Sequence, residues 1–438
     1  MKQTPIDFEI VKQKIKESGL KEVGKSSIRE IVKLISDIEK ATGQEYIHME
    51  MGVPGLEPPR MGIDAEIEAL NRGVASVYPD IEGLPELKQE ASRFAKLFLN
   101  IDISPKSCIP TVGSMQGSFA AFLVANRSDR NKEGTLFIDP CFPVHKQQCK
   151  ILGQACQSFD LFNYRGDKLK DKLESYFASG RISTLLYSNP NNPSWMCLTE
   201  EELQIIGELA TQYDVIVVED LAYFAMDFRK KMGTPGKPPF QSTVAHYTDN
   251  YYLTFSGSKV FSYAGQRTGL ILMSDKLYNR HYPDLLRYYS SDHFGHAVTY
   301  GAIYALTAGA PHSTQYGMAA MLKAVNDGTY DFVKDISEYG RRAQMMKKMF
   351  IDNGFKIVYD KDIDQPVSDG FYFTIIYPGM SGSQLIEELL FYGISAISLD
   401  ITGSEFEGLR ACVSQFRNDQ IPALEERLKK FREHHPLN

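Results

Sequence analysis

Short apolar runs alternate with longer amphipathic segments through the middle of the chain, from about residue 105 to about residue 275. Short apolar runs between turn signals are typical of buried strands, and an apolar residue at every third or fourth position is typical of a helix. Strands are expected at Cys108–Val112, Thr135–Asp139, Thr184–Ser188, Val215–Glu219, Tyr251–Phe255 and Leu270–Met273. The alternation predicts βαβ units and a large α/β domain with a doubly wound, mostly parallel sheet.

The pattern changes after residue 330, where a helix is followed by a few strands and a charged terminal helix. These elements are expected at Lys356–Tyr359, Phe371–Ile376, Leu409–Val413 and Ala423–His434. The first 50 residues are expected to form an arm and a helix that pack on this C-terminal part, giving a smaller α+β domain. We therefore predict an N-terminal arm over residues 1–60, a large domain over 61–330 and a small domain over 331–438.

Composition narrows the class of protein. The 438 residues are 43% hydrophobic and 24% charged, as in ordinary globular proteins, and the formal net charge is -7. Without a Lys/Arg block, the chain has no electrostatic footprint for nucleic acid. It also lacks an apolar run long enough for a membrane span, and its N-terminus lacks the apolar core of a signal peptide. We expect a cytoplasmic protein with no nucleic-acid or membrane partner.

Several common catalytic motifs are missing. The six cysteines form no CxxC pair, the nine histidines are scattered, and neither HExxH nor GxSxG occurs. We therefore expect reduced, mostly buried thiols and no metal site. The chemistry must come from other residues.

A lysine follows the strand expected at Tyr251–Phe255. It is Lys259, in Ser256-Gly-Ser258-Lys259. Ligands of open α/β sheets bind beyond the carboxyl ends of the strands, so a lysine here can form a Schiff base if its surroundings lower its pKa. By itself the lysine is equally well explained as a solvated loop residue.

Groups suited to a phosphate occur at two other places. Gly113, Ser114 and Met115 stand where the first strand turns into a helix, so backbone N–H groups and the Ser114 hydroxyl can bind an anion there. Arg267 follows eight residues after Lys259 and can hold a phosphate with two parallel hydrogen bonds. A capped helix start and a surface arginine are the alternatives.

A carboxylate closes another buried run, Val215-Ile-Val-Val-Glu-Asp220. Such an aspartate can keep the nitrogen of a heteroaromatic ring protonated, which makes the ring an electron sink. Tyr223 is placed to hydrogen-bond a phenolic oxygen of that ring. Asn192 lies in the turn Asn189-Pro-Asn-Asn192-Pro193, which is also ordinary turn chemistry.

Together these segments resemble the aspartate aminotransferase superfamily, the class I/II aminotransferases that use pyridoxal 5'-phosphate (PLP). The match runs in order from Gly52 to Arg410. The resemblance implies that Lys259 holds PLP as an aldimine, that Asp220 pairs with the pyridine nitrogen, and that Asn192 and Tyr223 bind the ring oxygen. It implies phosphate contacts from Gly113, Ser114, Met115, Ser256, Ser258 and Arg267.

The same resemblance assigns four further residues. Phe142 in Asp139-Pro-Cys-Phe142-Pro would stack on the cofactor ring, Gly52 would lie near the substrate carboxylate, and Arg410 would bind that carboxylate. Tyr78 would reach the phosphate of the other subunit, which implies a homodimer with shared sites. A buried core aromatic is the alternative for Phe142, and an exposed strand-end arginine is the alternative for Arg410.

The implied activity is transfer of an amino group from an amino acid to a 2-oxo acid with ping-pong kinetics. A carbon–sulfur β-lyase on the same scaffold remains an alternative, and a non-catalytic amino-acid sensor is a more remote one. Trp195 departs from the family's Asn-Pro-Thr-Gly turn, since it stands where a residue with positive φ is common. Arg287 is interpreted as a surface helix residue, so the sequence leaves the amino donor and the oxo-acid acceptor open.

Overall fold

The computed structural model describes residues 3–132 and 134–437, which form two compact units. Of these described residues, 3–55, 192–196 and 337–437 make up the small unit, and 56–132, 134–191 and 197–336 make up the large unit. The sequence predicted domain boundaries at residues 60 and 330, and the structure divides at residues 55 and 336. The segment 192–196 groups with the small unit, although the sequence analysis placed it inside the large domain.

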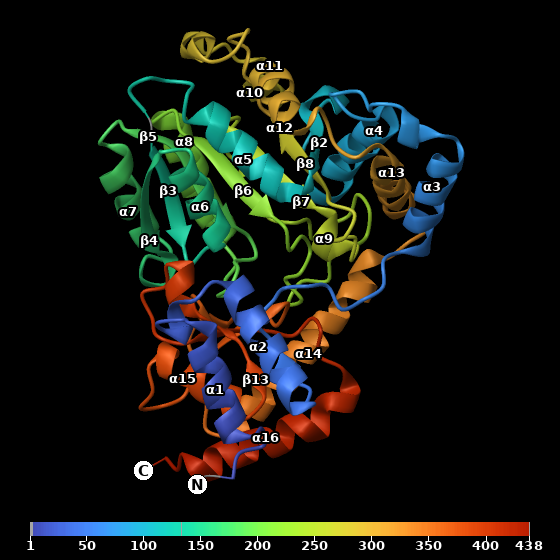
Figure 1. The fold of residues 1–438 in the computed structure, drawn as a ribbon. Coiled ribbons are helices and arrows are strands. Elements are labelled where there is room, and N and C mark those ends of the chain that lie inside the picture. The colour runs from blue at the N-terminus through green and yellow to red at the C-terminus, as the bar shows by residue number, and fades with distance from the viewer. Residues whose placement is uncertain (1–2, 133, 438) are drawn as a thin grey trace. The chain divides into compact units, whose positions relative to one another are not determined.

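A seven-stranded sheet forms the centre of the large unit (Figure 1). Its strands are β2 (Cys108–Val112), β3 (Gly134–Asp139), β4 (Ala155–Asp160), β5 (Ile182–Ser188), β6 (Ile216–Leu221), β7 (Tyr251–Ser256) and β8 (Thr268–Met273). The order is β2-β8-β7-β6-β5-β3-β4, and β8 runs antiparallel to both of its neighbours. The other strands therefore share one direction, which confirms the mostly parallel sheet.

Strand β4 at the edge of the sheet was not predicted. Its first four residues, 155–158, are exposed and spell Ala-Cys-Gln-Ser, so no apolar run marks them. Only Phe159 and Asp160 are buried. An edge strand that faces solvent lacks the continuous hydrophobic pattern of the central strands, which explains why the sequence analysis missed it.

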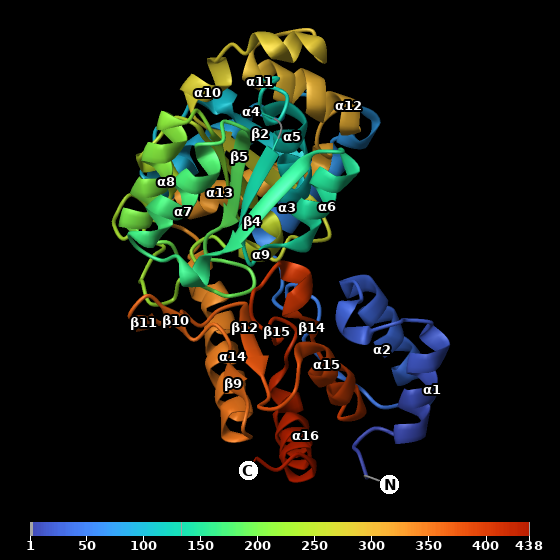
Figure 2. The ribbon, with the colours of Figure 1, turned by 90° about the vertical axis from the view of Figure 1, so that its left-hand side faces the viewer.

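Helices cover both faces of this sheet (Figures 1 and 2). Helices α5 (Gly113–Ala125) and α6 (Pro143–Ile151) lie on one face, and α7 (Lys168–Phe177) and α8 (Glu200–Gln212) lie on the other. Side chains of α5 and α6 share one apolar core with alternate residues of the central strands, among them Ile216 and Val218. The two layers confirm a doubly wound α/β domain. A capping box begins α8, because Thr199 and Glu202 each bond the other's backbone N–H.

Further helices complete the large unit. They are α3 (Arg60–Asn71), α4 (Pro85–Phe94), α9 (Gly257–Val260), α10 (Asp275–Asn279), α11 (Phe294–His296), α12 (Tyr304–Thr307) and α13 (His312–Asn326). Helix α13 packs mainly against α3 and α4. Helix α14 (Phe332–Asp352) begins in the large unit and continues into the small one.

The small unit is built on a four-stranded antiparallel sheet. Its order is β14 (Ile397–Ser398), β15 (Leu409–Cys412), β12 (Tyr372–Ile376) and β9 (Lys356–Ile357). A separate parallel pair joins β1 (Ile47–His48) to β13 (Ile394–Ser395), so the N-terminal segment is hydrogen-bonded to the C-terminal one. The helices are α1 (Phe8–Ser18), α2 (Ile28–Thr42), α15 (Gly382–Phe391) and α16 (Ile421–His434).

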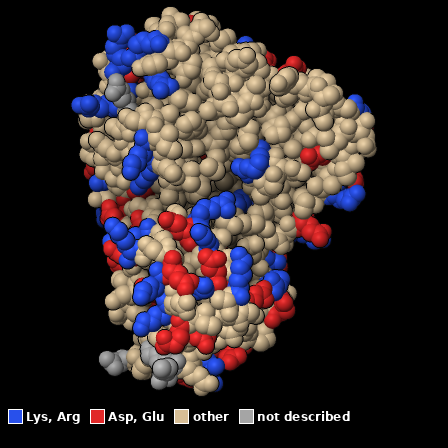
Figure 3. All heavy atoms as spheres, viewed as in Figure 1, with Lys and Arg blue, Asp and Glu red and all other residues tan. Residues whose placement is uncertain are grey.

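Acidic and basic side chains are interspersed over α1, α2 and α16 on the face drawn in Figure 3. Pairs such as Lys14 with Glu17, at 2.7 Å, join neighbouring positions of one helix. Among the described residues, no helix combines the length and the hydrophobicity needed to span a membrane.

Candidate active site

Several of the predicted site residues lie at one edge of the large sheet. Asp220 is the fifth residue of β6, Ser256 ends β7, and Gly113 follows the last residue of β2. These strands run in the same direction, so their carboxyl ends meet at this edge. Arg267 immediately precedes β8, whose opposite direction brings its start to the same edge.

The Asp220 carboxylate is held in one orientation. Its Oδ1 accepts hydrogen bonds from the Thr254 hydroxyl and the Ala222 N–H, each at 3.1 Å. Thr254 stands directly opposite Asp220 in the β6–β7 register. Burial raises the pKa of Asp220 to about 6, and the bond from Thr254 limits that rise. A positive partner at Oδ2 would relieve the cost of this buried charge.

His145 in the first turn of α6 is close to the same carboxylate. Its Nε2 atom lies 4.0 Å from Oδ2 of Asp220, and burial lowers the pKa of the imidazole to about 4. Its ring also meets the ring of Phe142 edge-on, with centroids 5.5 Å apart. Phe142 is half-buried, so it is not the fully buried core aromatic considered as the alternative.

The turn at the start of α5 leaves room for an arginine. Gly113 has φ +67°, and a β-carbon built there would lie 2.4 Å from Nη2 of Arg267. A side chain at this position would therefore collide with the guanidinium. The Nη1 atom of Arg267 donates to the Ser258 hydroxyl at 3.4 Å and to the Ala264 carbonyl at 3.0 Å. A helix N-terminus, a guanidinium and a serine hydroxyl thus come together, which is an arrangement suited to an anion.

The predicted lysine lies in helix α9 rather than in an open loop. Ser256 caps this short helix by accepting a hydrogen bond from the Ser258 N–H at 3.2 Å. Lys259 is half-buried there, which argues against the fully solvated loop lysine considered as its alternative. Tyr223 is 4% exposed and lies in the turn after β6.

Arg410 occupies the interior of the small unit, where it is 1% exposed. It stands in β15, and its Nη2 donates to the Glu50 carbonyl at 2.7 Å, while Nη1 donates to Oδ1 of Asn192 at 3.4 Å. The guanidinium also covers the ring of Tyr372, 4.5 Å from its centroid. The alternative of an exposed strand-end arginine is therefore wrong.

Two tightly constrained positions adjoin this cluster in the small unit. A β-carbon on Gly52 would lie 2.0 Å from the Tyr372 hydroxyl, so only glycine fits there. Trp195 adopts φ +63°, the conformation that the departure from the family pattern made questionable. Its ring is fully buried and lies edge-on to Tyr372, with centroids 6.0 Å apart.

Three residues considered in the sequence analysis have exposed side chains. Tyr78 is 88% exposed in the connection between α3 and α4. Met115 is 39% exposed in the first turn of α5, where its backbone rather than its side chain was expected to act. Arg287 lies on the surface and donates to the backbone carbonyl of Asp284 at 3.0 Å, as expected for a surface helix residue.

Four residues that make these contacts were not predicted from the sequence: Thr254, His145, Glu50 and Tyr372. The alternation of side chains along β7 offered a signal for Thr254, because it shares a sheet face with Ser256 two residues later. His145 contacts Asp220 through the packing of α6 on the sheet, and no local motif encodes that contact.

Comparison with known proteins identifies the family. The model for aminotransferase class I and II matches residues 44–361. The chain belongs to the class I and II aminotransferases. This membership confirms the expected family, and with it an enzyme of the transferase class.

Relatives of the chain are aminotransferases too. A probable aspartate aminotransferase of Methanocaldococcus jannaschii is 26% identical over 370 residues, which cover 83% of this chain and 84% of the relative. The glutamate–pyruvate aminotransferase of Escherichia coli is 27% identical over 238 residues, covering 52% of this chain and 54% of the relative. These matches support aminotransferase function over the β-lyase alternative.

Solved structures share the fold. An aspartate aminotransferase of Thermotoga maritima superposes with a TM-score of 0.74 at 18% identity, covering 96% of this chain and 99% of that one. An alanine aminotransferase of Pyrococcus furiosus has a TM-score of 0.75 at 19% identity, covering 95% and 99%. The predicted fold class is thus confirmed.

Proposed function

We propose that this aminotransferase binds PLP in its large unit and moves an amino group from an amino acid to a 2-oxo acid. The observation that carries the proposal is the anion cradle of Gly113, Ser258 and Arg267, which lies at the same sheet edge as the buried carboxylate of Asp220. PLP has a phosphate that would bind in the cradle and a basic ring nitrogen that would pair with Asp220.

The residues present fit this cofactor. The Arg267 guanidinium, the N–H groups of Gly113, Ser114 and Met115, and the hydroxyls of Ser114, Ser256 and Ser258 would hold the phosphate. Asp220 would keep the ring nitrogen protonated, and the positive ring would in turn stabilise the carboxylate whose burial raises its pKa to about 6.

The remaining cofactor contacts follow the same assignment. Phe142 would stack on the ring face, while Tyr223 and Asn192 would hydrogen-bond its oxygen. Bound PLP supplies a conjugated ring that takes up the electron pair released at the α-carbon of the substrate. Lys259 would carry the cofactor and then move the proton at that carbon.

Arg410 would bind the α-carboxylate of every substrate, with Gly52 and Asn192 beside it. The guanidinium is already oriented by the Glu50 carbonyl and by the Tyr372 ring. Two charge-assisted bonds from such a fixed group would orient the substrate as well as hold it.

Reduction of the PLP-loaded protein with borohydride tests the lysine assignment. Mass spectrometry should find the pyridoxyl group on Lys259, and Lys259→Ala should retain PLP through the phosphate contacts while losing turnover. Lys276→Ala, an exposed lysine of the same unit, is the matched control. A pyridoxyl group on another lysine would reject the assignment. A panel of amino donors with 2-oxoglutarate or pyruvate then identifies the preferred pair.

We further infer that the active form is a homodimer in which Tyr78 reaches the partner's phosphate site. Exposed apolar side chains occur close to Tyr78 along the chain. They are Ile67 and Leu70 on α3 and Val77 beside Tyr78. A group of this kind is typical of an interaction surface.

Mixing two inactive variants tests the shared site. Tyr78→Ala and Lys259→Ala proteins should together recover part of the activity, because one of the two hybrid sites then contains both residues. Sedimentation should show the mixed species to be dimeric. Absence of recovery although labelled subunits exchange would refute the sharing.

A further inference from the structure

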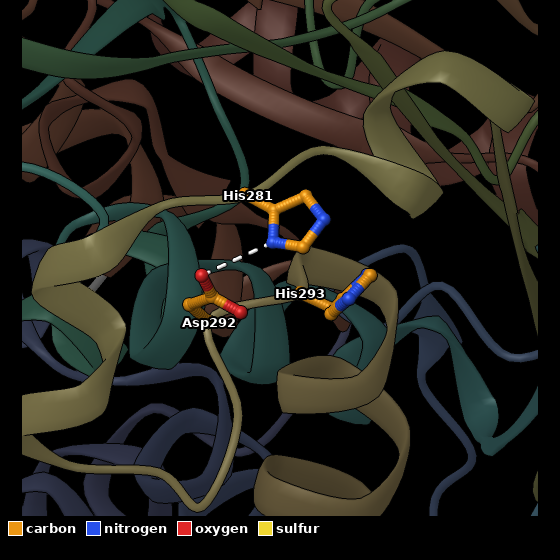
Figure 4. A group of neighbouring side chains, drawn as sticks. All are labelled: His281, Asp292 and His293. Atoms are coloured by element: carbon orange, nitrogen blue, oxygen red, sulfur yellow. Dashed lines mark hydrogen bonds and ion pairs between the residues drawn. The ribbon is translucent and has the colours of Figure 1, made fainter.

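A second cluster of potential ligands lies on the large unit, in the surface segment between α10 and α11. Figure 4 shows His281, Asp292 and His293 with their side chains turned toward one another. The two histidines form an isolated antiparallel bridge. The Tyr282 N–H donates to the Asp292 carbonyl at 2.8 Å, and the Phe294 N–H donates to the Arg280 carbonyl at 2.9 Å. The backbone thus fixes both arms that carry the cluster.

The side-chain geometry is close to that of a metal site. One ligand atom from each of the three residues lies within 4.8 Å of the other two. Nδ1 of His281 is 3.1 Å from Oδ2 of Asp292, and the two imidazole centroids are 3.8 Å apart. Metal–ligand distances of about 2.0–2.2 Å require ligand atoms about 3.3 Å apart, so small side-chain rotations suffice.

The nearby arginines pair with other carboxylates, so the Asp292 carboxylate remains available to the two histidines. Arg280, which precedes His281, donates to both oxygens of Asp214, at 2.6 and 2.7 Å, and Arg287 pairs with Asp284 at 3.6 Å. The hydrogen bond from His281 lowers the pKa of Asp292 below the ordinary value of an aspartate. His281 and Asp292 have side-chain exposures of 58% and 30%, which leaves an open side for water.

We propose that His281, Asp292 and His293 bind a divalent transition-metal ion such as Zn²⁺, with water completing the coordination. Two imidazoles and one carboxylate are ligands that Zn²⁺, Ni²⁺ and Cu²⁺ accept. Binding releases any proton held by the ligating nitrogens and replaces the His281–Asp292 hydrogen bond with two metal bonds. The ion ties the two arms of the segment together. No sequence spacing marked the site, because ten residues separate His281 from Asp292.

Calorimetric titration with Zn²⁺ alone tests the proposal on the PLP-loaded, full-length protein. Cys156→Ser serves as the parent, because Cys156 is the exposed thiol among the six cysteines and a thiolate is a ligand that Zn²⁺ accepts. The parent should bind one ion per chain at this site. His281→Ala and His293→Ala should each weaken binding about tenfold or more, the scale on which mutations at a metal site act. His246→Ala, an exposed histidine of the same unit, should bind as the parent does. Equal binding by the His281→Ala/His293→Ala double variant would overturn the proposal.

A measurement without histidine variants keeps the test independent of their folding. Diethyl pyrocarbonate modifies accessible imidazoles, and mass spectrometry locates the modified residues. Zn²⁺ should protect His281 and His293 while His246 continues to react. Equal protection of all three, or of none, would show that Zn²⁺ does not bind at this cluster.

Discussion

Nε2 of His145 lies 4.0 Å from Oδ2 of Asp220, and both side chains are buried. Burial acts on them in opposite directions, since it raises the pKa of Asp220 to about 6 and lowers the pKa of His145 to about 4. At neutral pH the carboxylate is therefore ionised beside an uncharged imidazole. This arrangement leaves Asp220 without a cation on that side, and a protonated ring nitrogen would supply one.

Asp220→Asn keeps the size of the side chain but removes its charge. We expect kcat/KM to fall at least about a hundredfold, as when one preorganised electrostatic group is removed. PLP content should persist, because the phosphate contacts belong to other residues. Steady-state kinetics with absorbance of bound PLP measures both. Asp249→Asn, an exposed carboxylate of the same unit, should behave as wild type, and equal activity of the two variants would contradict the role of Asp220.

Arg410→Ala tests recognition of the carboxylate. Hydrogen bonds to charged groups contribute about 1.5–3 kcal/mol each, so loss of two should lower kcat/KM about a hundredfold or more. The fall should be similar for donors with different side chains. Both kcat and KM should worsen, because a misplaced substrate reacts more slowly. Arg410→Lys should recover only part of the loss, since lysine lacks the planar fork.

Arg417→Ala provides the matched control for Arg410. Arg417 belongs to the same unit but is exposed, with its guanidinium 3.0 Å from Glu45. Its replacement should leave kcat/KM unchanged and alter stability by at most about 0.5 kcal/mol. A drop for Arg410→Ala that is confined to acidic donors would assign Arg410 to side-chain recognition instead. PLP content must stay constant for either interpretation.

The sequence predicted most of the large unit because its central strands are buried on both faces and leave continuous apolar runs. It failed at β4, whose exposed residues carry no such run. Because these apolar runs locate the ends of the strands, the site residues that follow the strands could be predicted as well. The contacts of His145 with Asp220 and of Tyr372 with Arg410 depend on packing between segments far apart in sequence, so no local pattern could supply them.

Trp195 and Gly370 form a tightly fitted pair within the small unit. A β-carbon on Gly370 would lie 2.0–2.2 Å from three atoms of the indole ring. Gly370→Ala should therefore destabilise the protein by about 1–3 kcal/mol through overpacking. Trp195→Gly relieves the positive φ, but loss of the buried ring should cost about 3–5 kcal/mol, so the variant should also be less stable.

A double-mutant cycle separates this contact from unrelated effects. In the Trp195→Gly background the ring is gone, so Gly370→Ala should cost much less than in the wild type. Urea denaturation of the wild type, the two single variants and the double variant gives the coupling free energy between the two positions. Gly379→Ala has no neighbour within 4 Å but has φ +85°, so it reports backbone strain alone and should cost the same in both backgrounds. Additive effects at Trp195 and Gly370 would contradict the packing.

Glu219 is a buried carboxylate next to Asp220, but it points to the opposite face of the sheet. It accepts hydrogen bonds from the Thr243 hydroxyl at 2.6 Å and from the Val244 N–H at 3.1 Å. Burial raises the pKa of Glu219 from 4.5 to about 7, because these bonds offset only part of the effect of burial on the pKa. Between these two pH values the folded state binds more protons than the unfolded state, so the free energy of unfolding falls as pH rises.

Glu219→Gln removes this titration while keeping an acceptor for Thr243. At one pKa unit per 1.36 kcal/mol, the stability of the variant relative to wild type should rise by about 3 kcal/mol as pH increases from below 4.5 to above 7. Urea denaturation of both proteins at pH 5, 6, 7 and 8 should capture most of that rise. Other titrating groups are common to both proteins and cancel in the difference. Glu86→Gln, an exposed glutamate in the first turn of α4, should give a difference that is flat with pH. If the Glu219→Gln difference is also flat, Glu219 does not titrate in this range, and burial is not raising its pKa.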